Sequence, residues 1–128
     1  MQERFEDQRE QFERALARLR EVLAASETDI VRDALIQRFE FTFEMAWRCL
    51  HRFLELKGER LVQKAWAVLP EVFQSKLIDD AELWDQLREY RNLTSHTYQE
   101  AMAVQVAAFI RARAVGAFDR LAERLRTP

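Results

Sequence analysis

Apolar side chains return every three or four positions along most of this chain, and the pattern is strongest over residues 29–57. One face of this segment carries Val31, Leu35, Phe39, Phe43, Trp47, Leu50 and Leu54, and the band is widened by Phe41, Met45 and Phe53. Positions three and four apart lie on one face of an α-helix, so the segment is predicted to be helical. A helix that is apolar over so much of its circumference is expected to be central, touching more than one neighbour or a second subunit.

The first half of the chain supplies two further helical segments. Residues 4–25 are predicted to form the first helix, and its apolar stripe consists of Phe5, Phe12, Ala15, Leu16, Leu19, Val22 and Leu23. Ser26 is expected to cap the central helix, with Asp29 in its first turn. Residues 61–77 form a shorter helical region, in which Pro70 starts a new helix or causes a kink because it lacks a backbone N–H.

The second half is also helical. The Asp-Asp-Ala-Glu sequence at residues 79–82 is typical of a helix start, and this helix leads into residues 91–98. A last helix is expected over residues 99–125, with Gly116 marking close packing or a bend. Its apolar stripe consists of Val104, Ala108, Val115, Phe118, Leu121 and Leu125. We therefore predict an all-α, up-and-down bundle of four to five helices, forming one domain over residues 1–128.

Composition narrows the possible functions. The 128 residues include only two Gly and two Pro, and the net charge of −2 gives no overall attraction to nucleic acid, so any RNA contact requires a local basic patch. No Cys/His cluster has the spacing of a zinc site, and we expect neither a metal nor a cofactor. Residues 1–10 are unlike a signal peptide, and the longest apolar run, residues 101–110, is too short to cross a bilayer. A cytoplasmic protein with no membrane association is expected.

The densest group of chemically useful side chains is the eight-residue run Arg91-Asn92-Leu93-Thr94-Ser95-His96-Thr97-Tyr98. It brings together a guanidinium group, an imidazole, hydroxyls, a carboxamide and a phenol within about two helical turns. If the run lies where a helix ends, these side chains converge instead of spreading around a cylinder. We call residues 91–98 the signature segment and predict that it forms the functional site.

The signature segment has an Arg, four intervening residues, a His, one residue and a Tyr. This pattern resembles the motif of the HEPN superfamily of small helical domains. The complete eight-residue sequence is more similar still to that of the nucleotidyltransferase substrate-binding proteins. The genes of this branch usually pair with that of a minimal nucleotidyltransferase. Residues 38–47, Arg-Phe-Glu-Phe-Thr-Phe-Glu-Met-Ala-Trp, resemble the aromatic and acidic helix of that branch. Residues 77–80 resemble the connection that precedes its signature helix.

The resemblance implies a two-fold homodimer in which the two signature segments face each other. It also implies a toxin that cleaves RNA without a metal, with Arg91 and His96 as catalytic residues. The paired nucleotidyltransferase would be the antitoxin, silencing the toxin by transferring AMP to Tyr98. Another interpretation of the same branch is a non-catalytic subunit that binds a nucleotide or other substrate for the transferase. A structural adaptor is a third possibility, for which the polar cluster is hard to explain.

These residue types suit metal-free RNA cleavage. Histidine ordinarily titrates at roughly pH 6.5 and therefore serves as a proton donor or acceptor at neutral pH. Arginine keeps its charge and presents a planar fork that matches two phosphate oxygens. One histidine cannot easily be both base and acid on opposite sides of a phosphorus atom, so the chemistry favours a composite site with a second His96. Attack by the 2′-hydroxyl would restrict the activity to RNA.

Several supporting residues are predicted with alternatives left open. Asn92 holds substrate or orients Arg91, while Thr94 and Ser95 act as local caps or phosphate donors. Glu40 and Glu44 either belong to a solvated ion-pair ladder with Arg48 or reach Arg91 or His96 and orient them. The other expectations concern a solvent-facing His51, a small core or surface Cys49, and a surface for RNA or an acidic partner at Arg113, Arg120 and Arg124.

Overall fold

The computed structural model describes residues 2–56 and 76–126, and every regular element in these ranges is helical. The elements, in chain order, are α1 (Gln2–Leu23), α2 (Asp29–Leu56), α4 (Ala81–Leu93), a 3₁₀ turn (Thr94–His96), α5 (Glu100–Phe109), a π-helical turn (Ile110–Ala114) and α6 (Val115–Arg126). Most of the helix expected over residues 61–77, including Pro70, lies outside the described residues. The other expected helices are present.

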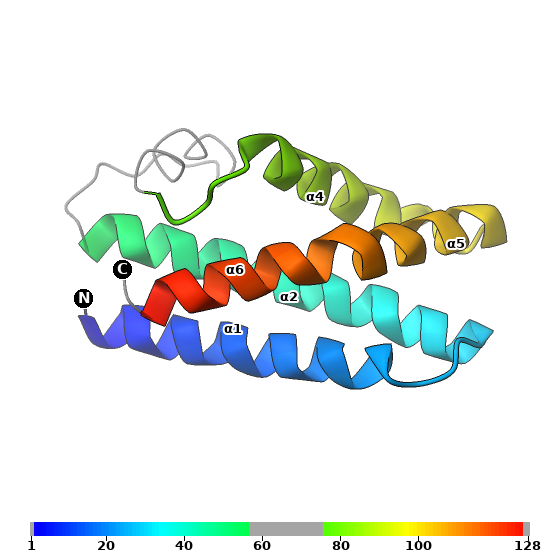
Figure 1. Ribbon diagram of the computed structural model, residues 1–128, viewed down its shortest axis with the longest axis horizontal. Coiled ribbons are helices and arrows are strands. Elements are labelled where there is room, and N and C mark those ends of the chain that lie inside the picture. The colour runs from blue at the N-terminus through cyan, green and yellow to red at the C-terminus, as the bar shows by residue number, and fades with distance from the viewer. Residues whose placement is uncertain (1, 57–75, 127–128) are drawn as a thin grey trace.

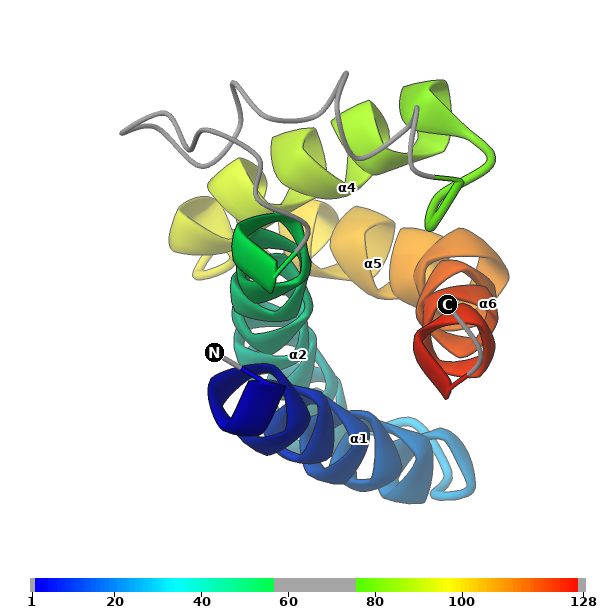
Figure 2. The same ribbon diagram turned by 90° about the vertical axis from the view of Figure 1, so that its left-hand side faces the viewer.

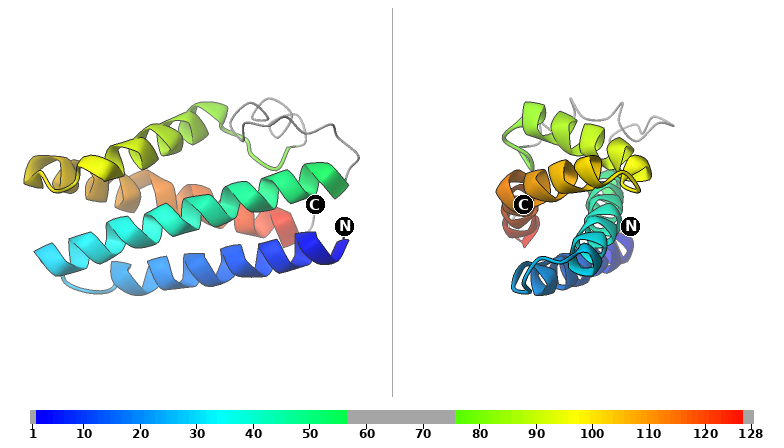
Figure 3. Two further views of the ribbon diagram at one scale, coloured as in Figure 1. Left: turned by 180° about the vertical axis from the view of Figure 1, so that it is seen from behind. Right: turned by 90° about the vertical axis from the view of Figure 1, so that its right-hand side faces the viewer.

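The helices run alternately in opposite directions (Figure 1). α1 leads away from the end that carries both termini, α2 returns, α4 leads away again, and α5 with α6 returns (Figure 3). α2 lies between α1 and α4 when the bundle is viewed from the end with the termini (Figure 2). It also contacts α5 and the π-helical turn, as expected of a central helix. The predicted all-α, up-and-down bundle is confirmed.

Side-chain caps fix two of the helix starts. The backbone N–H of Val31 donates to the hydroxyl of Thr28 (3.1 Å), so Thr28 and not Ser26 caps α2. The reason is distance along the chain: a cap must immediately precede the first helical residue, which is Asp29. Asp80 caps α4 as predicted, accepting a hydrogen bond from the N–H of Leu83 (3.0 Å).

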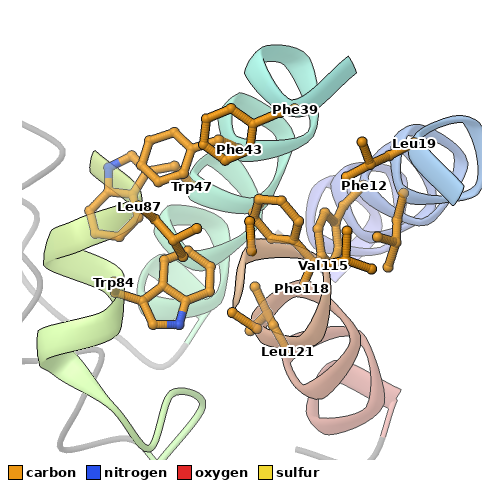
Figure 4. Packing of buried hydrophobic residues seen from close by; sticks show 14 of the residues in the cluster. Phe12, Leu19, Phe39, Phe43, Trp47, Trp84, Leu87, Val115, Phe118 and Leu121 are labelled. Carbon is orange, nitrogen blue, oxygen red and sulfur yellow. The ribbon is translucent and has the colours of Figure 1, made fainter. Parts of the chain in front are cut away.

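Phe118 of α6 packs against aromatic residues of α1, α2 and α4. Its ring, which is fully buried, lies 6.1 Å from each of the rings of Phe12 in α1, Phe39 in α2 and Trp84 in α4 (Figure 4). Two of these pairs are edge-to-face, a favourable geometry for aromatic rings. Trp84 also packs against Phe43, so an aromatic layer connects α4 to α2.

The π-helical turn changes which residues of the last helix are buried. Val104 is 44 % exposed and Ala108 is exposed, contrary to the predicted stripe, whereas Ala103, Val106, Ala107 and Ile110 are buried. A π turn holds an extra residue, so α-helical spacing counted backwards from Val115 and Phe118 reaches the wrong face. The part of the predicted stripe that lies in α6 is buried as expected.

Gly116 directly follows the π-helical turn. A Cβ atom placed there would have its nearest neighbour at 3.5 Å, the tip of the Arg120 side chain, which is an ordinary contact distance. Close packing therefore does not explain this glycine, and the local irregularity of the helix is the π turn before it.

The continuous helix Glu100–Arg126 is long and apolar enough to cross a membrane by length and composition. Half of its most apolar window is buried within the bundle, where it packs against α1 and α2. A core helix of a water-soluble bundle passes the same test. From the shorter apolar run at residues 101–110, the sequence predicted no membrane-crossing segment. The burial of this helix is compatible with that prediction.

Candidate functional site

The signature segment lies at the joint between α4 and α5, at the end of the bundle opposite the termini (Figure 1). Arg91 is in the last turn of α4, the 3₁₀ turn follows at Thr94–His96, and α5 begins at Glu100. The chain therefore leaves the helical spiral within the segment, as the sequence led us to expect.

Three hydroxyl groups stabilise this joint. Thr94, Ser95 and Thr97 each donate to the backbone carbonyl three residues earlier, on Arg91 (2.6 Å), Asn92 (3.1 Å) and Thr94 (2.9 Å) respectively. Such bonds satisfy carbonyl groups that the end of a helix leaves without partners. The local-cap interpretation of Thr94 and Ser95 therefore matches their geometry.

Arg91 is held by a residue of α2. Its Nη1 lies 3.2 Å from Oε2 of Glu40 and donates to the Thr94 hydroxyl at 3.1 Å. The same Glu40 oxygen is 3.2 Å from the Thr94 hydroxyl, which is buried. Arg91, Glu40 and Thr94 thus form a polar cluster that connects α4 to α2, and one of the two predicted alternatives for Glu40 is present.

One edge of the Arg91 guanidinium has no bonded partner among the described residues. No described residue bonds to its Nε or Nη2, and 37 % of the side chain is exposed. These two nitrogens form the edge of a guanidinium that binds two oxygens of a phosphate side by side. The cluster therefore leaves the phosphate-binding edge available while it restrains the opposite edge.

Glu44 does not belong to this cluster. Its carboxylate pairs with Arg48 at 3.2 Å, and both side chains are at least half exposed. Four residues advance about 6 Å along a helix axis, which carries Glu44 away from the end of α4 where Arg91 lies. The prediction of Glu44 as a supporting residue is wrong for this structure, and its contact is the solvated ion pair that was the alternative.

His96 and Tyr98 project from the surface of the joint. His96 is exposed, Tyr98 is 80 % exposed, and their rings lie edge-to-face with centroids 6.4 Å apart. Asn92 is also exposed. A phenol this exposed is accessible to another protein, and an exposed imidazole is accessible to a substrate.

A groove of about 480 Å³ lies beside the joint, between the first half of α2 and the start of α5. Glu40, Thr97 and Tyr98 line it, whereas Arg91 and His96 do not. Sequence reasoning missed its other polar lining residues, which are Asp29, Arg32, Asp33, Gln37 and Glu100. The polar residues at positions 29, 33 and 37, spaced four apart on one face of a helix, were the sequence signal that could have indicated this groove.

A second groove, of about 430 Å³, lies between α1 and the second half of α2. His51 lines it and is half-buried against Trp47, and its Nε2 has no hydrogen-bond partner among the described residues. His51 is therefore not solvent-facing, contrary to the prediction. Cys49 is fully buried nearby, and burial raises the pKa of its thiol to about 12. Neither residue lies at the signature segment.

Two arginines of the expected surface in α6 are close to Asp79. Arg124 pairs with Asp79 at 2.8 Å, and this hydrogen bond lowers the pKa of Asp79 despite the opposing effect of partial burial. Arg124 is thus already engaged by a carboxylate. Within residues 2–56 and 76–126, no three metal-binding side chains gather closely enough to hold an ion.

Comparison with known proteins gives consistent results. Residues 7–127 match the family model described as nucleotidyltransferase substrate binding protein like. A Haemophilus influenzae protein named probable ribonuclease HepT is 34 % identical over 89 residues, which cover 63 % of this chain and 61 % of that protein. The match thus spans less than two thirds of that relative's length. A crystal structure of a Thermus thermophilus protein has a TM-score of 0.77 at 32 % identity, covering 90 % of this chain and 98 % of the other.

Proposed function

Because this chain belongs to the nucleotidyltransferase substrate-binding branch of the HEPN superfamily, we propose that it is the toxin of a toxin–antitoxin pair. In this proposal it is a metal-independent endoribonuclease, active as a cytoplasmic homodimer and inhibited by a cognate minimal nucleotidyltransferase. The observation that carries the proposal is that one short joint holds both the restrained, partly exposed guanidinium of Arg91 and the exposed imidazole of His96.

The cluster supplies the phosphate-binding part of the reaction. Arg91 would place its free Nε and Nη2 edge against the oxygens of the scissile phosphate, where negative charge accumulates as the 2′-oxygen attacks. Glu40 and Thr94 would fix the guanidinium before substrate arrives, so the arrangement requires little reorganisation during the reaction. Glu40 is thus a positioning residue in this proposal, since it acts through Arg91.

The proton transfers are assigned to histidine. One His96 would accept the proton of the 2′-hydroxyl, whose oxygen then forms a bond to phosphorus as the bond to the 5′-oxygen breaks. The departing 5′-oxygen must receive a proton on the opposite side, and His96 of a second copy would donate it. The exposure of His96 at the surface of the joint is compatible with such a composite site.

Tyr98 is the proposed acceptor of AMP. Its phenol is 80 % exposed and lies beside His96, so a modified Tyr98 would place a bulky, charged group next to the imidazole. This would block RNA and explain inhibition by the partner. Incubation with ATP and the nucleotidyltransferase is expected to increase the intact mass by one or more AMP units, and Tyr98→Phe is expected to abolish the increase. An increase that persists in Tyr98→Phe would refute the assignment.

A second candidate function is that of a non-catalytic subunit that presents a nucleotide or another substrate to the transferase. The family description favours it, and the groove beside Tyr98 provides a candidate binding volume. The negative charge of that groove weighs against a nucleotide polyphosphate, because four of its lining residues are carboxylates and one is an arginine.

The two candidates are separated by an RNA cleavage assay in EDTA with protein purified free of its partner. The chain has only two histidines, so His96→Gln has a matched control in His51→Gln, in the second groove. We expect cleavage by the native chain and by His51→Gln, and none by His96→Gln or Arg91→Ala. RNA that stays intact with the native chain, while the protein binds nucleotide, would favour the binding subunit.

A further inference from the structure

The groove beside Tyr98 has an unusual distribution of charge. Among the described residues, its walls carry the carboxylates of Asp29, Asp33, Glu40 and Glu100 and one cation, Arg32. Glu40 is committed to the cluster with Arg91 and Thr94. The side chains of Asp29 and Glu100 are 88 % and 80 % exposed, and Asp33 is exposed as well. Three carboxylates are therefore presented to the outside.

The single cation in the groove does not neutralise them all. Arg32 is only 15 % exposed and lies 3.4 Å from Glu27, 3.4 Å from Asp29 and 3.9 Å from Glu100, so its charge is shared among three acids. Asp33 forms no ion pair with the described residues, although it is on the face of α2 that lines the groove. The surplus charge in the groove is negative.

This surplus restricts what can occupy the groove. RNA is excluded because its phosphates would be repelled, and the described residues offer no arrangement of three ligands for a metal ion. The proposed homodimer joins two copies through His96, which does not line the groove. A symmetric contact of groove with groove would instead oppose the three carboxylates of one copy to those of the other, and like charges in juxtaposition oppose association. Cationic side chains of a different protein are the complementary occupant.

Two exposed apolar residues support a role of the groove in protein binding. Tyr98, 80 % exposed, forms part of the groove wall, and Ile30, 81 % exposed, is adjacent in sequence to Asp29 at the other side. Apolar residues next to complementary charges are a usual composition for a protein interface. An enzyme that modifies the Tyr98 hydroxyl must also approach this residue, which lines the groove.

Building on the proposed function, we propose that this groove is the docking site for the cognate nucleotidyltransferase. The partner would insert lysine or arginine side chains of a basic segment between Asp33 and Glu100, with Ile30 and Tyr98 in apolar contact. Docking there would bring the transferase to Tyr98 without competing for the free edge of Arg91, which lies outside the groove.

Charge reversal at Asp33 tests the inference. Asp33 is exposed and has no ion pair among the described residues, so Asp33→Lys removes no described contact that stabilises the fold. The matched control is Glu123→Lys, which also reverses a negative charge, but at an exposed position of α6 that does not line the groove. Circular dichroism and the melting temperature of each variant establish that it is folded.

Binding of each variant to the purified nucleotidyltransferase is measured by isothermal titration calorimetry. We expect Asp33→Lys to raise Kd about tenfold or more, Asp33→Asn to have an intermediate effect, and Glu123→Lys to bind like the native chain. We also expect Kd of the native chain to increase with salt between about 50 and 300 mM, and that of Asp33→Lys to increase less.

Equal affinity of the native chain and Asp33→Lys would overturn the docking site, as would an equal loss of affinity in Glu123→Lys. A change of the dimer dissociation constant in Asp33→Lys, with unchanged affinity for the transferase, would assign the groove to self-association instead. Failure of the ribonuclease proposal is a separate result, because it is read from RNA cleavage in the absence of the partner.

Discussion

Replacing Glu40 by Gln tests whether positioning of Arg91 matters for RNA cleavage. The substitution keeps the size of the side chain and an oxygen that accepts a hydrogen bond, but it removes the charge 3.2 Å from Nη1 of Arg91. Both partners are about one-third exposed, at 37 % and 35 %, so the ion pair itself is worth at most about 1 kcal/mol after solvent screening. For a chain of this size that corresponds to a decrease of at most about 4 °C in Tm.

The expected effect on catalysis is larger than the effect on stability. Without the carboxylate, the guanidinium samples other rotamers, and its Nε and Nη2 edge is aligned with the phosphate for less of the time. A loss of about 1.4 to 2.8 kcal/mol of transition-state stabilisation lowers kcat by about 10- to 100-fold. We expect kcat to fall more than KM changes, and Glu40→Asp to recover part of the rate because it restores the charge.

The assay is the initial rate of cleavage of a fluorescent RNA in EDTA, with a melting curve for each variant. Glu44→Gln is the matched control, since it makes the same change four residues along α2, where the carboxylate pairs with Arg48 instead. A native rate in Glu40→Gln, or an equal loss in Glu44→Gln, would refute the role assigned to Glu40. A decrease in kcat that is fully explained by a loss of folded protein would also refute the role assigned to Glu40.

Three further outcomes follow from the packing of the bundle. Gly116→Ala is expected to raise the free energy of unfolding by about 1 kcal/mol, because the new Cβ meets only the tip of Arg120, and urea denaturation would contradict this by showing a loss. Phe118→Ala is expected to cost about 3 to 5 kcal/mol by leaving a cavity among three aromatic partners, and Phe41→Ala, at a half-buried position, should cost clearly less. Cys49 should resist alkylation until the chain unfolds. Because the folded state holds the thiol proton up to about pH 12, stability should fall as pH rises from about 9 towards 12, and alkylation as fast in buffer as in urea would disprove the burial argument.

The sequence predicted the helices well where one apolar face continues without interruption. α2 was expected over residues 29–57 and is found at Asp29–Leu56, because its stripe has a single phase from Val31 to Leu54. The stripe of the last helix was predicted with the wrong phase before Val115, because a π turn has no clear mark in the residues themselves. Helical periodicity thus locates an element more reliably than it assigns the buried face on both sides of an irregular turn.

The geometry around the candidate site could be foreseen only in part, for a similar reason. Local sequence was sufficient for the signature segment, whose hydroxyls bond to carbonyls only three residues away. Sequence could not decide between Glu40 and Glu44, since both lie on one face of α2 and the choice depends on how far α4 is displaced along it. The acidic groove was missed because its two walls come from α2 and the start of α5, which are distant in sequence.

The central claim is that Arg91 and His96 catalyse attack by a 2′-hydroxyl on the neighbouring phosphate. Its most direct test compares an RNA oligonucleotide with the same molecule carrying one 2′-deoxy nucleotide at the cleaved position, in EDTA, with mass analysis of the product ends. The account predicts cleavage of the first to a 2′,3′-cyclic phosphate and a 5′-hydroxyl, and no cleavage of the second at that position. Cleavage of the deoxy substrate there, or products that end in a 5′-phosphate, would contradict it.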